Sequence, residues 1–317
     1  MYTLPDKQYW SGRIDSENDQ NAFRLHQVME LKDVETLTEN ESAFGFVGFE
    51  CEEGVRRNKG RLGAALAPNK IRQFLSPLPY NLERKLLDTG NVACEGQELE
   101  KAQEELGRHL HKLYSSSCTP IILGGGHETL YGHYLGARNH IGPDASLGII
   151  NIDAHFDMRD EPLPSSGTMF KQILEQDAHA GYLCIGIQEF GNTESLFQTA
   201  DRLGCTYIYE EDVAANNFIK TFGEIDRFAA NYDYLILTLC TDSIISYAAP
   251  GVSAPSPFGL DPKTVKTLLR YIAEKDNLLS FDISEVNPVY DEGDRTVRLA
   301  AYLIAEVLRH FNKKPTS

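Results

Sequence analysis

The sequence predicts an α/β fold: a three-layer αβα sandwich around a mainly parallel sheet of about eight strands. Short, almost continuously apolar runs alternate with longer amphipathic segments, a pattern typical of parallel strands covered on both faces by helices. Polar stretches rich in Asp, Glu and His follow several of these runs, at the carboxyl ends where such folds bind ligands. Because no Gly/Ser-rich linker or repeat interrupts the 317 residues, we expect a single domain spanning 1–317.

The expected elements follow from the periodicity of apolar residues. Eight runs are expected to be strands, the second of them the weakest: 44–49, 86–92, 120–125, 147–153, 182–187, 206–211, 234–240 and 278–284. Amphipathic stretches predict helices at 98–114, 193–204, 219–230, 261–275 and 294–311. Residues 1–41 are polar, and we expect them to wrap the core as an irregular segment.

The composition excludes several classes of protein. The formal net charge of −16 disfavours nucleic-acid binding, which requires a basic face. No apolar run reaches the roughly 18 to 20 residues of a membrane span, and the first residues lack the pattern of a signal peptide. The six cysteines are scattered without a C-x-x-C pair, so we expect reduced thiols and a cytoplasmic protein without a membrane partner.

The stretch NIDAHFDMR places three potential metal ligands at one strand end. Alternate side chains of an extended chain share a face, so Asp153, His155 and Asp157 are expected to point the same way. Carboxylate oxygen combined with imidazole nitrogen suits Mn²⁺, Fe²⁺ or Zn²⁺. The alternative is a solvated strand end with a capping aspartate, but the strict spacing favours a metal site.

Three further strand ends carry candidate site residues. GGGHETL brings His127 to the edge of the sheet after a glycine-rich turn. TLCTDSI ends another strand and places Cys240 and Asp242 on one face. FDISEVNP places Glu285 just past its strand. Each taken alone has an ordinary interpretation: a strand-to-helix turn, a helix cap, or a surface glutamate. Together they predict a shared site at one edge of the sheet.

The four motifs GGGHE, DAHFD, the strand before APGVSAP, and SEVNP resemble in order and spacing those of the ureohydrolases, the arginase and agmatinase superfamily. The stretches WSGRID, ECEEGVRRNKGRLGA, DMRDEPLPSSGTMF and GIQEFGNTESLF look more narrowly like formimidoylglutamases. The resemblance therefore covers nearly the whole chain, and it implies an arginase-like fold.

The resemblance also implies a reaction. Two Mn²⁺ ions per subunit would share a bridging hydroxide that attacks N-formimidoyl-L-glutamate, giving L-glutamate and formamide in histidine degradation. By motif, His127, Asp153 and Asp157 would bind one ion, and Asp153, His155 and Asp242 the other. Asp157 would carry a proton to the departing amine, and Glu285 would face the amidinium nitrogens.

One position departs from the family's pattern. Cys240 stands where the family usually has a second bridging aspartate. A thiolate is softer than a carboxylate and favours Zn²⁺ or Fe. Either Cys240 ligates, or it is a buried thiol and one ion is held weakly, so the number of bound metals stays open.

The charge of the substrate bears on specificity. Formimidoylglutamate carries two carboxylates, which favour guanidinium partners, whereas arginine and agmatine are cationic. Phe170 stands where arginases place a histidine, which weakens an arginase interpretation. The residues expected to bind the small anionic amino-acid substrate are Arg159, Arg57, Asn58, Ser166, Gln188 and Asn192.

Two other functions remain open from the sequence. An agmatinase or guanidinobutyrase would keep the fold and the chemistry, but basic residues at 57 and 159 argue against a cationic substrate. A metal-poor, non-catalytic relative is supported by Cys240 alone. No motif determines the oligomeric state, and the family implies that a homo-oligomer is compatible with this sequence.

Overall fold

The computed structural model describes residues 1–213 and 218–312, and the strands in these residues form one ten-stranded sheet. The order is β1-β4-β3-β5-β10-β9-β6-β7-β8, and β2 also pairs with β4. All pairings are parallel except that of β1 with β4. The strands are β1 (Tyr2–Thr3), β2 (Met29–Leu31), β3 (Ala43–Glu50), β4 (Lys85–Ala93), β5 (Thr119–Leu123), β6 (Leu147–Ile152), β7 (Ala180–Ile187), β8 (Thr206–Tyr209), β9 (Tyr234–Cys240) and β10 (Leu278–Ser284).

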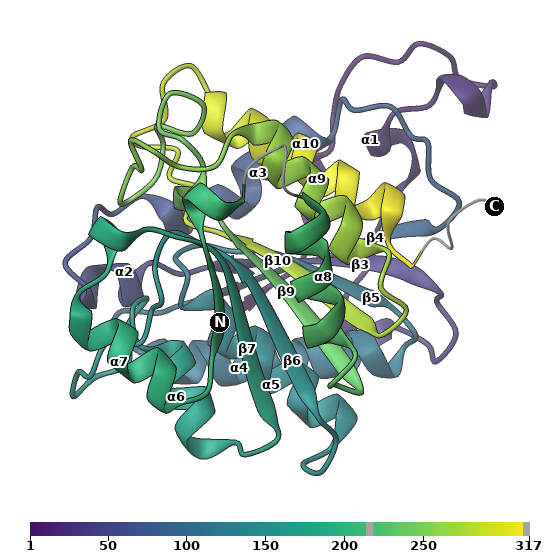
Figure 1. Ribbon diagram of the computed structural model, residues 1–317. Coiled ribbons are helices and arrows are strands. Elements are labelled where there is room, and N and C mark those ends of the chain that lie inside the picture. Colours follow the sequence, from purple (N-terminus) through teal and green to yellow (C-terminus); the bar gives the residue numbers. More distant parts are fainter. Residues whose placement is uncertain (214–217, 313–317) are drawn as a thin grey trace.

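The α-helices cover both faces of this sheet, as the alternating pattern predicts. Figure 1 shows α3, α8, α9 and α10 on one side and α4, α5, α6 and α7 on the other. Within the described residues, no helix combines the length and apolarity needed to cross a membrane. The helices are α1 (Leu25–Val28), α2 (Glu53–Arg57), α3 (Ala67–Leu75), α4 (Leu99–Ser115), α5 (Thr129–Ile141), α6 (Met169–Gln176), α7 (Glu194–Arg202), α8 (Phe218–Ala229), α9 (Pro262–Ala273) and α10 (Arg295–His310).

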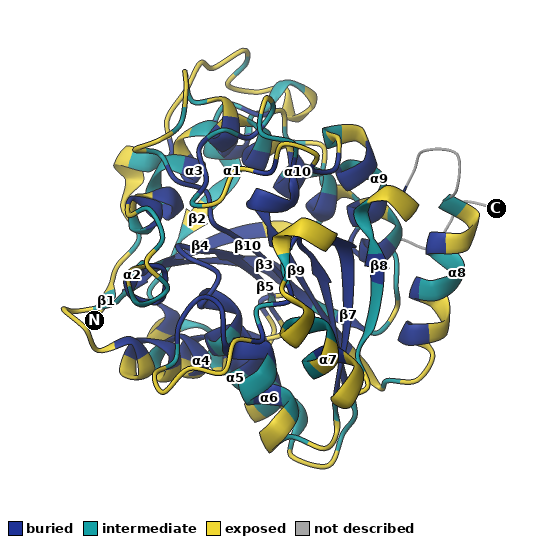
Figure 2. Cartoon of the chain, turned by 60° about the vertical axis from the view of Figure 1, so that its left-hand side comes forward, coloured by how far each residue is buried: buried dark blue, intermediate teal, exposed yellow. Residues whose placement is uncertain are grey.

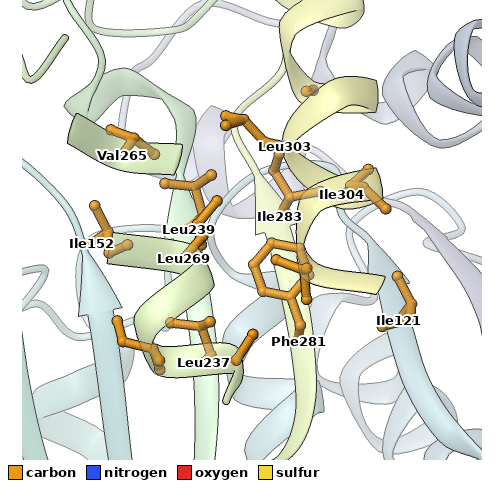
Figure 3. Close-up of a cluster of buried hydrophobic side chains, with 14 of the residues drawn as sticks. Ile121, Ile152, Leu237, Leu239, Val265, Leu269, Phe281, Ile283, Leu303 and Ile304 are labelled. Atoms are coloured by element: carbon orange, nitrogen blue, oxygen red, sulfur yellow. The ribbon is translucent and has the colours of Figure 1, made fainter. Parts of the chain in front are cut away.

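The core consists of two apolar layers, one on each face of the sheet. Along β5, Ile121 and Leu123 face one layer and Ile122 faces the other, as the two-residue repeat of a strand requires. The strands are buried throughout their central part (Figure 2). In the first layer, Phe281 and Ile283 of β10 pack against side chains of α9 and α10 (Figure 3).

The N-terminal segment is more regular than expected. It contributes β1 and β2, which is why the sheet has ten strands instead of about eight. It is also attached through Trp10, whose indole N–H donates to the Asp88 carboxylate at 2.6 Å. Arg72 from α3 binds both oxygens of that carboxylate at 2.8 Å, and all three side chains are buried.

The same contacts explain why β4 gave the weakest sequence signal although it spans nine residues. Its polar centre, around Asp88, disrupts the apolar run that indicates a buried strand. In the folded protein these polar groups have partners, since Arg72 also binds the side chain of Asn91 and the carbonyl of Gly90. A buried polar group costs little once it is paired.

Candidate metal centre

Four strands that are neighbours in the sheet deliver the candidate ligands. In the order β5-β10-β9-β6, their carboxyl ends lead into His127, Glu285, the Cys240–Asp242 turn and the Asp153–Asp157 stretch. The parallel register brings Ser284 beside Cys240 and Ile152 beside Leu239, so the four strands end at the same level. The predicted constellation is therefore assembled at one edge of the sheet.

Asp153 lies at the centre of the constellation. Its Oδ2 is 3.1 Å from Nδ1 of His127, and its Oδ1 is 3.6 Å from Nδ1 of His155. The Nδ1 atom of His127 is also 2.9 Å from Asp157 Oδ2, and that of His155 is 3.4 Å from Asp242 Oδ2. Both imidazoles thus direct Nδ1 at carboxylates, and Asp153 joins the two halves.

The donor atoms fit two cations that share one aspartate. Potential ligand atoms of Asp153, His155 and Asp242 lie within 4.8 Å of one another, and so do those of His127, Asp153 and Cys240. The Cys240 thiol also donates to Asp242 at 2.9 Å. Imidazole, carboxylate and thiol donors suit transition-metal ions. Asp157 belongs to neither group of three, although it contacts His127.

The electrostatics of the site call for positive charge. Burial, together with the charge of Asp153, raises the pKa of Asp157 to about 6. Burial and the charge of Asp242 raise the pKa of Glu285 well above its ordinary value. Burial would also raise the pKa of Asp153, but hydrogen bonds from His127 and His155 hold it below its ordinary value. Bound cations would relieve this crowding of carboxylates.

The backbone adopts restricted conformations at two of these residues. Asp157 (φ 49°) and Glu285 (φ 67°) are left-handed, a region that residues other than glycine seldom occupy. The turn before His127 needs glycine for another reason: a Cβ on Gly125 would lie 1.8 Å from the carbonyl oxygen of Cys51. The surrounding fold stabilises these conformations, as is common at functional sites.

A cavity of about 110 Å³ lies beside the candidate ligands and has a mixed wall. Besides the ligands and Glu285, its polar lining includes Asn58, Arg159, Ser166, Asn192 and Ser253. His155 and Gly191 line it and also line a larger neighbouring hollow of about 910 Å³. The site is therefore reached from a broad opening.

A family model described as the Arginase family matches residues 42–309. The chain belongs to the arginase family. Among its relatives, a formimidoylglutamase of Geobacillus sp. (strain WCH70) is 53% identical, covering 99% of this chain and 98% of that protein. A formimidoylglutamase of Staphylococcus aureus (strain MRSA252) is 39% identical, covering 98% of this chain and 100% of that protein.

Solved structures share the arginase-family fold and confirm the predicted fold class. Formimidoylglutamase from Bacillus subtilis subsp. subtilis str. 168 aligns with a TM-score of 0.83 at 22% identity, covering 95% of this chain and 96% of that chain. Trypanosoma cruzi formiminoglutamase with Mn²⁺ aligns with a TM-score of 0.81 at 24% identity, covering 92% of this chain and 99% of that chain.

Three of the expected substrate-binding residues of this arginase-family chain lie together on the cavity wall. Arg159 lines the cavity, and its guanidinium makes no hydrogen bond or ion pair with any described residue. The Asn58 amide donates to Ser166 Oγ at 3.2 Å, which joins two loops 108 positions apart in sequence. The aliphatic part of Arg159 and the Asn58 amide both pack around Gly167.

The other three are placed differently. Arg57 uses all five N–H groups on Glu53, Glu100, Pro164 O and Gln97 O, and it does not line the cavity. Asn192 lines the cavity, but its carboxamide binds backbone groups of residues 154, 156 and 188. Gln188 lines the larger hollow instead.

Two further side chains contact the candidate site, one from behind a ligand and one on the cavity wall. The Phe170 ring is fully buried and meets the His127 ring edge-on at 5.8 Å, so it packs behind a ligand. Ser253, which the sequence did not single out, lines the cavity and accepts the backbone N–H of Arg61 at 2.9 Å. Its position within APGVSAP was the available signal.

Proposed function

We propose that this chain is a formimidoylglutamase: it hydrolyses N-formimidoyl-L-glutamate to L-glutamate and formamide, the reaction of histidine degradation, with two Mn²⁺ ions per subunit. The observation that carries the proposal is full-length identity of 39–53% to proteins named formimidoylglutamase. An Arg159 guanidinium without a partner among the described residues agrees with it, since the substrate is anionic.

In this proposal the ions are held by the two ligand groups that share Asp153. His127, Asp153, Asp157 and Cys240 hold one ion, and Asp153, His155 and Asp242 hold the other. A pair of divalent cations supplies Lewis-acid activation of water near neutral pH. The placement of the Cys240 sulfur among the donor atoms supports its role as a ligand.

Glu285 binds and orients the amidinium group of the substrate. Its Oε2 is buried without a hydrogen-bond partner among the described residues, while Oε1 is held by the backbone N–H of His127. A fixed carboxylate with one free oxygen matches a planar cation that carries N–H groups. Substrate binding would satisfy this oxygen.

Asp157 delivers a proton to the departing amine of glutamate. Its carboxylate lines the cavity and lies 2.9 Å from His127 Nδ1, so it stands between the candidate ligands and the space open to the substrate, where a general acid has to be. Its backbone, in the left-handed region, is followed two residues later by Arg159 on the same wall. We assign substrate-carboxylate binding to Arg159 with Asn58 and Ser166, and assign Arg57 and Asn192 to the support of the surrounding loops. Gln188 keeps a buried amide nitrogen without a hydrogen-bond partner among the described residues and lines the larger hollow.

Proton NMR of N-formimidoyl-L-glutamate incubated with Mn²⁺-loaded protein tests the proposal. We expect formamide and glutamate to appear, to vanish with a chelator, and to return on addition of Mn²⁺. Agmatine and 4-guanidinobutyrate serve as competing substrates in parallel tubes. Turnover of either of these in place of formimidoylglutamate would overturn the substrate assignment, and failure to bind Mn²⁺ would overturn the enzyme assignment.

A further inference from the structure

A buried chain of polar side chains extends from His127 into the sheet. His127 Nε2 lies 3.1 Å from Thr238 Oγ1 on β9, and that hydroxyl donates to Asp282 Oδ1 on β10 at 2.8 Å. Asp282 Oδ2 is 2.7 Å from Nδ1 of His133 on α5. Thr238, Asp282 and His133 are all fully buried. This series of hydrogen-bonded side chains therefore contacts the His127 ring on the side opposite the carboxylates of the site.

The proton positions in this chain follow from counting donors. A threonine hydroxyl has one proton, and Thr238 gives it to Asp282, so Thr238 can only accept from His127. His127 Nε2 must then carry a hydrogen. The nitrogen that can give up its hydrogen and offer a lone pair to a metal is consequently Nδ1, the atom that lies 3.1 Å from Asp153 and 2.9 Å from Asp157.

We propose that Thr238 and Asp282 are positioning residues that fix the ring orientation and the tautomer of His127, so that Nδ1 faces the metal site. The inference rests on the metal centre of the proposed function, but not on the identity of the substrate. Partners of this kind orient ligand imidazoles and raise their basicity. His133, which packs behind Asp282, holds the carboxylate in place.

The location of these hydrogen-bonded side chains argues against a purely structural role. Thr238 is a polar residue within the apolar centre of β9, and Asp282 lies between Ser280 and Ser284 on β10, all of them buried where an unpaired polar group would be costly. Aliphatic residues would fill both positions without any need for partners. Both side chains nevertheless have hydrogen-bond partners, and Thr238 connects the pair to the candidate metal site through His127.

The second candidate histidine has no such support among the described residues. His155 directs Nδ1 at Asp153 and Asp242, its side chain is 28% exposed, and it borders the larger hollow. The two ions should therefore depend differently on Thr238. Loss of the Thr238 hydroxyl should weaken the ion at His127 and leave the ion at His155 unaffected.

A titration of metal-free protein with Mn²⁺, with free Mn²⁺ counted by electron paramagnetic resonance, tests this directly. Thr238→Val keeps the side-chain shape but removes the hydroxyl, and it should weaken one of the two ions by roughly 10- to 100-fold. Thr238→Ser should restore the affinity. The matched control is Ser284→Ala, because Ser284 donates to the same Asp282 oxygen without reaching His127; it should bind both ions as the parent does.

Two results would overturn the proposal: parent-like binding of both ions by Thr238→Val, or equal weakening by Ser284→Ala. If Thr238→Val does not fold, an NMR experiment on the parent protein tests the proposal instead. In ¹⁵N-histidine-labelled protein loaded with Zn²⁺, the His127 signal, assigned with His127→Asn, should show a hydrogen on Nε2; a hydrogen on Nδ1 refutes the proposal. No substrate enters either experiment, so failure here is distinct from failure of the proposed function.

Discussion

Glu285 accepts a hydrogen bond at 2.9 Å from the backbone N–H of His127, a residue 158 positions earlier in the sequence. One carboxylate oxygen therefore holds the glycine-rich turn after β5, and the other is buried without a hydrogen-bond partner among the described residues. The contact joins the ends of β5 and β10, which are neighbours in the sheet. Under the proposed function, the placement of His127 and the binding of the amidinium group thus depend on one side chain.

Glu285→Gln should separate these two roles. The amide oxygen can still accept from His127, so we expect the Mn²⁺ content to be retained. Loss of the negative charge facing the amidinium removes about 2 kcal/mol or more, which lowers kcat/KM by roughly 30-fold or more. Steady-state kinetics with metal analysis checks this. Unchanged turnover at full metal occupancy would show that Glu285 does not face the substrate.

Arg159→Asn tests the carboxylate anchor. A charge-assisted hydrogen bond to a ligand contributes about 1.5 kcal/mol or more, so KM for formimidoylglutamate should rise by roughly tenfold. The control is Arg56→Asn, because Arg56 is exposed and pairs with Glu53 away from the cavity. An unaltered KM in Arg159→Asn, or an equal rise in the control, would exclude Arg159 as the anchor.

Cobalt substitution tests Cys240. A thiolate bound to Co²⁺ gives a charge-transfer absorption in the near ultraviolet, and we expect it in the parent and not in Cys240→Ser. Cys118→Ser is the control, since Cys118 is also a buried free thiol but belongs to neither ligand group. If the parent, fully loaded with Co²⁺, lacks this absorption band, Cys240 does not bind the metal and one ion has fewer protein ligands.

His109 should make stability depend on pH. Burial lowers its pKa from 6.5 to about 4, with Asp33 opposing the shift. Below pH 6.5 the unfolded chain therefore binds a proton that the folded protein does not. The contribution is fully present above pH 6.5 and is lost as the pH falls to 4, by about 3 kcal/mol.

Chemical denaturation of the metal-free protein between pH 4 and 7 measures this contribution. His109→Gln should flatten the dependence by that amount. His111→Gln lies on the same helix but is exposed, and it should leave the dependence as it is. Identical slopes for His109→Gln and the parent would mean that His109 is not the group responsible.

The Arg72–Asp88 pair should be important for folding. Asp88→Asn leaves the buried guanidinium without a countercharge, and we expect the free energy of unfolding to drop by about 3 kcal/mol. Trp10→Phe removes one donor to Asp88 and part of a buried ring, and should cost about 2 kcal/mol. The exposed pair gives the control: Glu105→Gln should cost less than about 1 kcal/mol. An Asp88→Asn variant as stable as the parent would contradict the importance of this pair for folding.

The parts of the site that are local in sequence could be predicted from sequence. Asp153, His155 and Asp157 share one extended stretch, so their spacing already indicated a common face. Arg57 shows the limit, because its engagement with Glu100 and Pro164 is a tertiary contact that no spacing reveals. The roles of the individual residues stay predictions until the variants above are measured.

The elements of the fold could likewise be predicted where their signal is local in sequence. The apolar runs predicted the central strands, and family members of known structure confirm the α/β class. β4 gave the weakest strand signal because Asp88 lies in its interior, and the partners of Asp88 come from Trp10 and Arg72. Thr238 and Asp282 were overlooked, although a threonine inside the apolar β9 and a charged residue inside the buried β10 are signals that could have revealed them.

The cavity wall divides into two sets of different origin. The candidate ligands lie on or within five residues of strand ends, whereas Arg159, Asn58, Ser166 and Ser253 stand farther along the loops. Loops accept substitution more readily than a close-packed sheet edge. Under the proposed roles of these residues, selection or a protein engineer can therefore exchange the recognised end of the substrate by changing a few loop residues while the hydrolytic centre is inherited intact.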